Sequence, residues 1–130
     1  MIPTGEVRPV AGTDFDFRAT RPIRKARDGA QVPYDHNFCL GRARVPLRTI
    51  AKAAGARSGV TMDVRSTEPG VQLYGGQKVN VPVAGLQGIR YGASSGFCLE
   101  AQVLARRGEP SGFPERGSAP GRDLQAGHGV

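Results

Sequence analysis

Short apolar runs alternate with breaks rich in glycine and proline along the first hundred residues of the chain. The runs are rich in Val, Ile, Leu, Phe and Tyr, and the breaks recur every eight to twelve positions. This spacing is typical of an antiparallel sandwich or barrel. The pattern predicts strands near residues 34–41, 46–54, 59–67, 71–75 and 97–103. We therefore expect an all-β fold.

The strand pattern is less clear in residues 47–56 and in residues 75–95. Residues 47–56 contain leucine, isoleucine and alanine, which could form the apolar face of a helix, although the neighbouring segments favour a strand. Residues 55–59 are expected to join this strand to the next one as a hairpin. Residues 75–95 show little periodicity, so they predict a long loop over the surface.

Composition and charge limit the kinds of binding partner that we expect for the chain. The chain has 130 residues, a formal net charge of +7 and no tryptophan. Its basic residues are scattered, apart from one cluster at Arg24, Lys25 and Arg27, so the charge alone gives little support for binding to nucleic acid. No run of 18 apolar residues and no signal-peptide pattern is present. We expect a soluble, cytoplasmic protein with neither a membrane nor a nucleic acid as partner.

The two cysteines, Cys39 and Cys98, each lie inside an apolar run. Neither belongs to a CxxC pair or to a His/Cys cluster with the spacing of metal ligands. The sequence therefore predicts buried, reduced thiols and no metal site.

Three polar residues stand out because they lie within or beside apolar, strand-like runs. Asp35 follows Tyr34, Gln72 lies between Val71 and Leu73, and Glu100 directly follows Leu99. Each also has a purely structural interpretation. Asp35 could be a turn residue, Gln72 could form a cross-strand hydrogen bond, and Glu100 could be a solvent-facing residue of a half-exposed strand.

Five segments together resemble the C-terminal part of the aldose 1-epimerase (galactose mutarotase) family. They are Ile2-Pro-Thr-Gly-Glu6, Gly12-Thr-Asp-Phe-Asp-Phe17, Tyr34-Asp-His-Asn-Phe38, Thr67-Glu-Pro-Gly-Val-Gln-Leu-Tyr74 and Gly96-Phe-Cys-Leu-Glu-Ala-Gln102. The resemblance implies part of a large antiparallel β-sandwich of the galactose mutarotase type, for which this chain is short. The motifs end at Gln102.

The resemblance also implies a reaction, the interconversion of the α and β anomers of an aldohexose such as galactose or glucose. A base removes the proton from the anomeric hydroxyl and an acid protonates the ring oxygen, without a metal or cofactor. By the family's motifs, Glu100 is the base, and Asp35 and Gln72 bind the monosaccharide. The family's acid belongs to an upstream His-Pro-Tyr-type motif that this chain lacks, and His36 is expected to be structural. We therefore expect a fragment that is inactive by itself.

The ends of the resemblance suggest a division of the chain. Residues 1–102 are expected to form the C-terminal part of a mutarotase-like sandwich domain, and residues 103–130, rich in Gly, Pro, Arg and Ser, are expected to be disordered. One hypothesis for this tail is a single-nucleotide frameshift near the Val103 codon. A hexose-phosphate epimerase of the same fold and a non-catalytic carbohydrate-binding remnant remain alternatives, and the sequence does not indicate an oligomeric state.

Overall fold

The regular secondary structure of the described residues consists of short strands and one 3-10 turn. The computed structural model describes residues 6–23, 26–27 and 30–103. Within them lie β1 (Ala26–Arg27), β2 (Ala30–Gln31), β3 (Asp35–Cys39), β4 (Arg48–Ala54), β5 (Thr61–Ser66), β6 (Gly70–Tyr74), one 3-10 turn η1 (Leu86–Gly88) and β7 (Cys98–Gln102). The expected all-β fold is confirmed.

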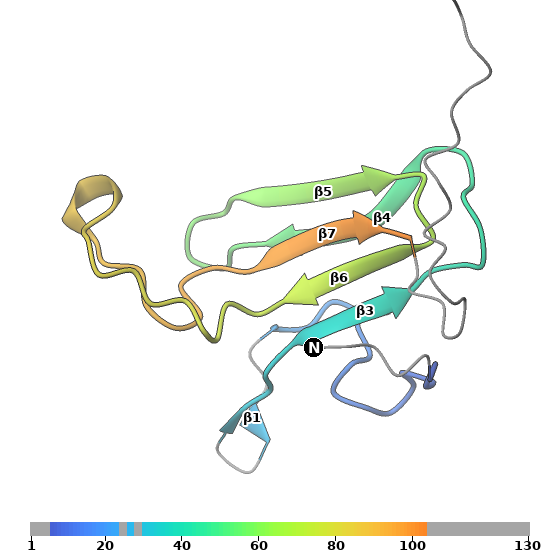
Figure 1. Ribbon diagram of the computed structural model, residues 1–130, viewed down its shortest axis with the longest axis horizontal. Coiled ribbons are helices and arrows are strands. Elements are labelled where there is room, and N and C mark those ends of the chain that lie inside the picture. Colours follow the sequence, from blue (N-terminus) through green and yellow to red (C-terminus); the bar gives the residue numbers. More distant parts are fainter. Residues whose placement is uncertain (1–5, 24–25, 28–29, 104–130) are drawn as a thin grey trace, which may run out of the picture.

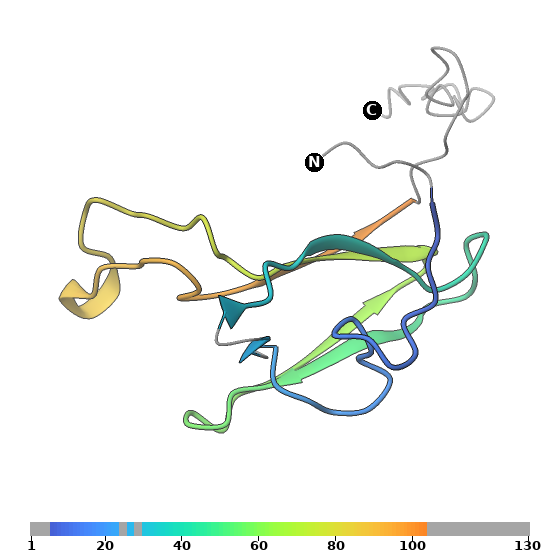
Figure 2. The same ribbon diagram turned by 90° about the horizontal axis from the view of Figure 1, so that it is seen from below.

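The strands form three antiparallel sheets. β6 is the central strand of a three-stranded sheet, with β3 and β7 on its two sides, while β4 pairs with β5 and β1 with β2. Figures 1 and 2 show the β4–β5 hairpin on one side of the three-stranded sheet, which gives the two layers of a sandwich.

All five predicted strands are present, each within a few residues of its expected bounds. The helical alternative for residues 47–56 is wrong, because β4 pairs along its length with β5. The loop between them closes as expected. The Gly59 N–H donates to the Gly55 carbonyl at 2.8 Å, and the Gly55 N–H donates to the Val60 carbonyl at 2.8 Å. Gly59 has a φ of +68°, a left-handed conformation that favours glycine. The β1–β2 hairpin was not predicted.

One face of the three-stranded sheet is apolar and covered. Val71 and Leu73 of β6 are buried there. The segment 6–20 lies on this side of the sheet, the side that also faces β4 and β5 (Figure 2). Its Phe15 and Phe17 pack against the aromatic side chains at alternate positions of the β3 region, with ring centroids 4.8 to 6.4 Å apart: Tyr34, His36 and Phe38. Edge-to-face contacts of this kind stabilise beyond simple burial.

Tyr34 anchors this segment. It is the most buried side chain of the described core, and its hydroxyl donates a hydrogen bond to the Asp14 carbonyl at 2.7 Å. The same carbonyl accepts from Arg21 Nη1 at 2.9 Å, and the Arg21 guanidinium lies 5.0 Å from the centroid of the Phe17 ring. The segment is therefore fixed to the sheet by both apolar and polar contacts.

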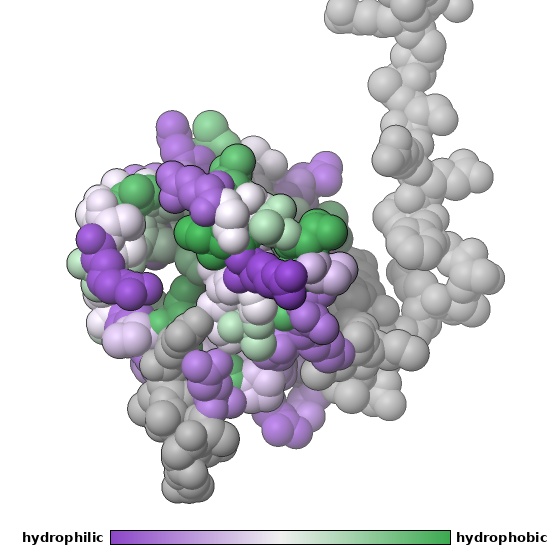
Figure 3. Space-filling view, turned by 90° about the vertical axis from the view of Figure 1, so that its left-hand side faces the viewer, coloured by the Kyte–Doolittle hydropathy of each residue, from purple (hydrophilic) through white to green (hydrophobic). Residues whose placement is uncertain are grey.

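The predicted surface loop is an ordered arm between β6 and β7, residues 75–97, which projects from the sheets and ends in η1 (Figure 1). Backbone hydrogen bonds hold its two limbs together, among them Val81 N–H to the Tyr91 carbonyl at 2.9 Å. Gly76 has a φ of +70°, and a Cβ there would collide with the Gly96 carbonyl. Apolar side chains reach the surface on the arm, including Val83 and Leu86, and Figure 3 faces this end of the molecule.

The described residues cover only part of the domain division predicted from the sequence. β7 ends at Gln102, where the sequence motifs end, but residues 104–130 lie outside the described residues. No helix within the described part of the chain is long and apolar enough to cross a membrane.

Candidate functional site

The second face of the three-stranded sheet collects the polar residues that the sequence singled out. Successive side chains of a strand point to opposite faces, so residues two apart share a face. We call this surface the polar face, and its residues come from β3, β6 and β7: Asp35, Asn37, Cys39, Gly70, Gln72, Tyr74, Cys98, Glu100 and Gln102. No described element lies over this face in Figure 2. The alternation that buries Val71 and Leu73 thus places the three candidate site residues together on the other face.

Strand register sets their relative positions. Gln72 at the centre of β6 lies directly opposite Asn37 on β3 and opposite Glu100 on β7. Directly opposed residues of an antiparallel pair have Cβ atoms about 4.5–5.5 Å apart. Asn37, Gln72 and Glu100 therefore form one row across three strands, and Asp35 lies in the adjacent row.

A side-chain hydrogen bond links two of the candidate residues. Gln72 Nε2 donates to Asp35 Oδ1 at 2.8 Å, and both side chains are half-buried. The bond joins diagonal positions on neighbouring strands. Its acceptor is a carboxylate oxygen, and hydrogen bonds to an ionised carboxylate are stronger than those between neutral groups. The cross-strand hydrogen bond that was the structural alternative for Gln72 is thus present, and it fixes the orientation of the Asp35 carboxylate on the open face.

Glu100 occupies a different environment. Its side chain is exposed, and within the described part of the chain it forms no hydrogen bond or ion pair. Its backbone is held in place because β7 pairs with β6 over five residues. The carboxylate is therefore positioned by the sheet but retains its lone pairs for another molecule.

The two cysteines contradict the prediction from sequence. Cys39 and Cys98 are free thiols, but both are exposed rather than buried. The reason is the strand period, since each cysteine lies an even number of residues from a polar-face carboxylate, Asp35 for Cys39 and Glu100 for Cys98. An apolar run placed them in strands but did not decide the face.

His36 lies on the opposite face from Asp35, in agreement with its expected structural role. Its ring packs edge-on against Phe15, with centroids 4.8 Å apart. Its Nδ1 accepts a hydrogen bond from the Asp35 N–H at 3.0 Å, which satisfies a backbone donor of β3. The side chain cannot reach a ligand on the polar face from this position.

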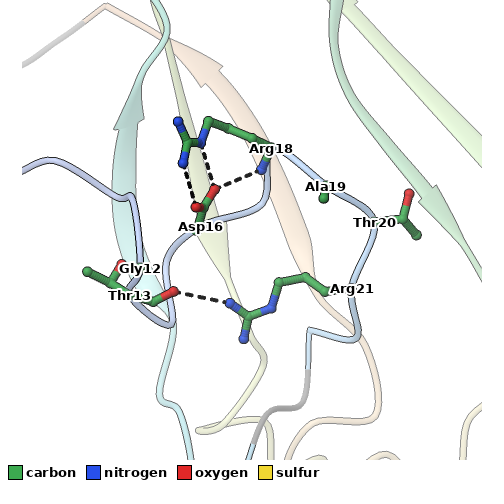
Figure 4. A pocket seen from close by; sticks show the side chains of 7 residues that line it. All are labelled: Gly12, Thr13, Asp16, Arg18, Ala19, Thr20 and Arg21. Atoms are coloured by element: carbon green, nitrogen blue, oxygen red, sulfur yellow. Dashed lines mark hydrogen bonds and ion pairs between the residues drawn. The ribbon is translucent and has the colours of Figure 1, made fainter.

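A separate depression lies in the N-terminal segment, away from the polar face (Figure 4). It is lined by Gly12, Thr13, Asp16, Arg18, Ala19, Thr20 and Arg21. Two of its charged groups pair with each other, since Arg18 donates to both carboxylate oxygens of Asp16 at 2.8 and 2.7 Å. These hydrogen bonds hold the pKa of Asp16 well below its usual range. The arrangement is that of a structural ion pair.

The described residues contain no group of three or more His, Cys, Asp or Glu side chains that could hold a metal ion. What the polar face offers is two carboxylates and several amides on an open surface. Ionised carboxylates accept hydrogen bonds from hydroxyl groups, and amides both donate and accept. This donor and acceptor set suits a polyhydroxylated ligand.

Comparison with known proteins agrees with this chemistry. A model of the aldose 1-epimerase family matches residues 1–127. The chain belongs to the aldose 1-epimerase family. The match continues past Gln102, where the motifs had led us to expect the resemblance to end.

Individual family members are similar over much of the chain. Galactose mutarotase of Sus scrofa is 36% identical over 95% of this chain and 36% of its own length, and that of Homo sapiens is 42% identical over 78% and 30%. An aldose 1-epimerase of Haemophilus influenzae is 30% identical over 79% and 31%. The chain thus spans about a third of the length of these family members.

Sequence reasoning missed one residue of the site, Asn37. It lies two positions from Asp35 and therefore shares its face, a signal that was already available from the strand period. Its place opposite Gln72 depends on the register between β3 and β6, which the sequence does not reveal.

Proposed function

We propose that the polar face binds an aldohexose such as galactose or glucose and that Glu100 is the base of aldose 1-epimerase chemistry. The observation that carries the proposal is the assembly of Asp35, Gln72 and Glu100 on one open sheet face in a chain of this family. In this arrangement, Asp35 and Gln72 hold the ring hydroxyls and Glu100 faces the anomeric hydroxyl.

The chemistry requires two proton transfers. Glu100 takes the proton of the anomeric hydroxyl, the C1–O5 bond breaks, and an acid delivers a proton to O5, which gives the open-chain aldehyde. Rotation about C1–C2 followed by the reverse steps produces the other anomer. An exposed carboxylate without an intramolecular partner among the described residues is suited to the first transfer.

The second transfer has no histidine donor on the described polar face, because His36 lies on the other side of the sheet. This observation favours a second candidate function, binding of a monosaccharide without turnover. The two candidates differ in the effect of an added proton donor. Imidazole buffer supplies imidazolium as an external acid. Because the buffer also catalyses mutarotation of the free sugar, the protein's contribution is the rate above that of the same buffer without protein.

The test is polarimetry of freshly dissolved α-galactose with the 130-residue chain across a series of imidazole concentrations. We expect the wild-type chain to accelerate mutarotation with increasing imidazole more steeply than Glu100→Gln, because the amide keeps the shape but cannot accept the proton. Loss of a general base costs about 10²–10⁴ in rate when the rest of the site is in place. Galactose binding is measured in parallel by NMR titration of both chains.

The outcomes separate the candidates. Equal rates for the two chains, with galactose bound by both, would remove Glu100 from the mechanism and support binding without turnover. If the wild-type chain does not bind galactose or glucose, the polar face is not a monosaccharide site and both candidates are wrong.

A further inference from the structure

Asn37 occupies the end of the central row of the polar face. It lies directly opposite Gln72, with Glu100 next along the same row on β7. Its side chain is half-buried, and its Oδ1 is shielded from solvent without a hydrogen-bond partner among the described residues. It is the only polar-face residue of the described chain with a shielded, unpaired side-chain atom of this kind.

An unpaired amide oxygen away from water costs free energy, so native proteins usually supply a partner. Gln72 Nε2, on the residue directly opposite, donates one of its two N–H groups to Asp35 and makes no hydrogen bond to Asn37 Oδ1. His36, the neighbour in sequence, points to the opposite face. The fold therefore places an amide with a shielded, unpaired oxygen beside the candidate site.

We propose that Asn37 is a third residue of the polar face that contacts the substrate. Its amide forms a hydrogen bond with a ring hydroxyl on the side of the hexose opposite the anomeric carbon. This inference rests on the proposed function. Rotation of the amide about its last bond exchanges Oδ1 and Nδ2, which have nearly the same shape, so either atom can meet a hydroxyl.

The position on the ring follows from the row. Asn37 and Glu100 lie on the two outer strands of the sheet, two strand spacings or about 10 Å apart at the backbone. With Glu100 on the anomeric hydroxyl and both side chains reaching inward, Asn37 meets the hydroxyl of C3 or that of C4. Galactose and glucose differ in configuration at C4. Asn37 is thus placed to influence which hexose the face prefers, since a buried polar group discriminates strongly against a ligand that leaves it unpaired.

The test combines protein variants with ligands that lack single hydroxyls. The wild-type chain, Asn37→Ala and the control Asn80→Ala, an exposed asparagine on the arm, are titrated by NMR with galactose and with its 2-, 3-, 4- and 6-deoxy derivatives. Asn37→Val is made in parallel, because a β-branched residue favours the strand and protects the test against misfolding.

We expect Asn37→Ala and Asn37→Val to weaken galactose binding roughly three- to tenfold, with Asn80→Ala unchanged. For 3-deoxygalactose or 4-deoxygalactose, the wild-type chain and the Asn37 variants should bind alike, because the contact is already absent. For 2-deoxygalactose and 6-deoxygalactose, the Asn37 variants should still bind more weakly than the wild-type chain.

Equal galactose affinity in wild type and in the folded Asn37 variants would overturn the assignment while leaving the proposed function intact. The same fold-loss for all four deoxy sugars would also overturn it, because Asn37 would then act only through the fold. If the wild-type chain fails to bind galactose or glucose, the proposed function fails first, and the assignment of Asn37 fails with it.

Discussion

Replacement of Tyr34 by phenylalanine tests how the N-terminal segment is held on the apolar face. The change removes one hydroxyl and keeps the ring that packs against Phe15 and Phe17. The lost interaction is the buried hydrogen bond from the Tyr34 hydroxyl to the Asp14 carbonyl, 2.7 Å long. A buried hydrogen bond between neutral groups contributes about 0.5–1.5 kcal/mol net.

The structure places the expected value within that range rather than above it. The Asp14 carbonyl keeps its hydrogen bond from Arg21 Nη1 at 2.9 Å, so the substitution does not leave an unpaired acceptor. A loss of about 1 kcal/mol lowers the melting temperature of a domain of 60–100 residues by about 4–8 °C. The matched control is Tyr74→Phe, whose hydroxyl accepts only an exposed bond from the Lys78 N–H at 3.0 Å.

Thermal unfolding followed by circular dichroism, with urea titration for the free energy, measures both variants. Tyr34→Phe should melt several degrees below wild type, and Tyr74→Phe within about 1 °C of it, since exposed hydrogen bonds exchange readily with water. A Tyr34→Phe chain as stable as wild type would refute the argument that this bond fixes the segment to the sheet.

Two further predictions concern charged residues. Asp35→Ala should weaken galactose affinity about tenfold in an NMR or calorimetric titration, because a charge-assisted hydrogen bond is lost from a half-open face. The control Asp63→Ala on β5 should leave the affinity unchanged. Equal affinities in wild type and both variants would make Asp35 a structural residue. The pKa of the Asp16 carboxyl should lie below the ordinary value of about 3.9 and return toward it in Arg18→Ala, as measured by NMR titration of the carboxyl carbon. Because the folded-state pKa is lowered, the stabilisation by this pair is present above about pH 4 and is lost as the pH falls through the lowered pKa; an unchanged Asp16 titration in Arg18→Ala would show that the pair does not cause the shift.

The strands were predictable because their signal is local. Alternation over 59–65 and the break at 55–59 that precedes it were enough to define β5 and the hairpin, and β4 followed from its neighbours. The short β1–β2 hairpin has no comparable pattern, since two residues per strand are too few to show a period.

The sequence predicted that Asp35, Gln72 and Glu100 belong to a candidate site, but it did not predict how they are arranged. The motifs named Asp35, Gln72 and Glu100, and the period of two placed Glu100 on one face with Cys98. The bond between Gln72 and Asp35 depends on pairing between segments far apart in the chain, which local patterns do not encode. The two cysteines have apolar neighbours in sequence, but their positions in the strand alternation place them on the polar face.

The order of the strands along the chain has a consequence for how the protein folds. β4 and β5 are neighbours along the chain and can pair through a short loop, whereas β3 reaches β6 only after that hairpin has been passed, and β7 reaches β6 only across the arm. Long loops must lose more entropy before their ends meet, so such pairings form late during folding. We therefore expect the β4–β5 hairpin to form early during folding. The surface that carries the carboxylates and amides is assembled only when the last strand docks, which ties any binding there to completion of the fold.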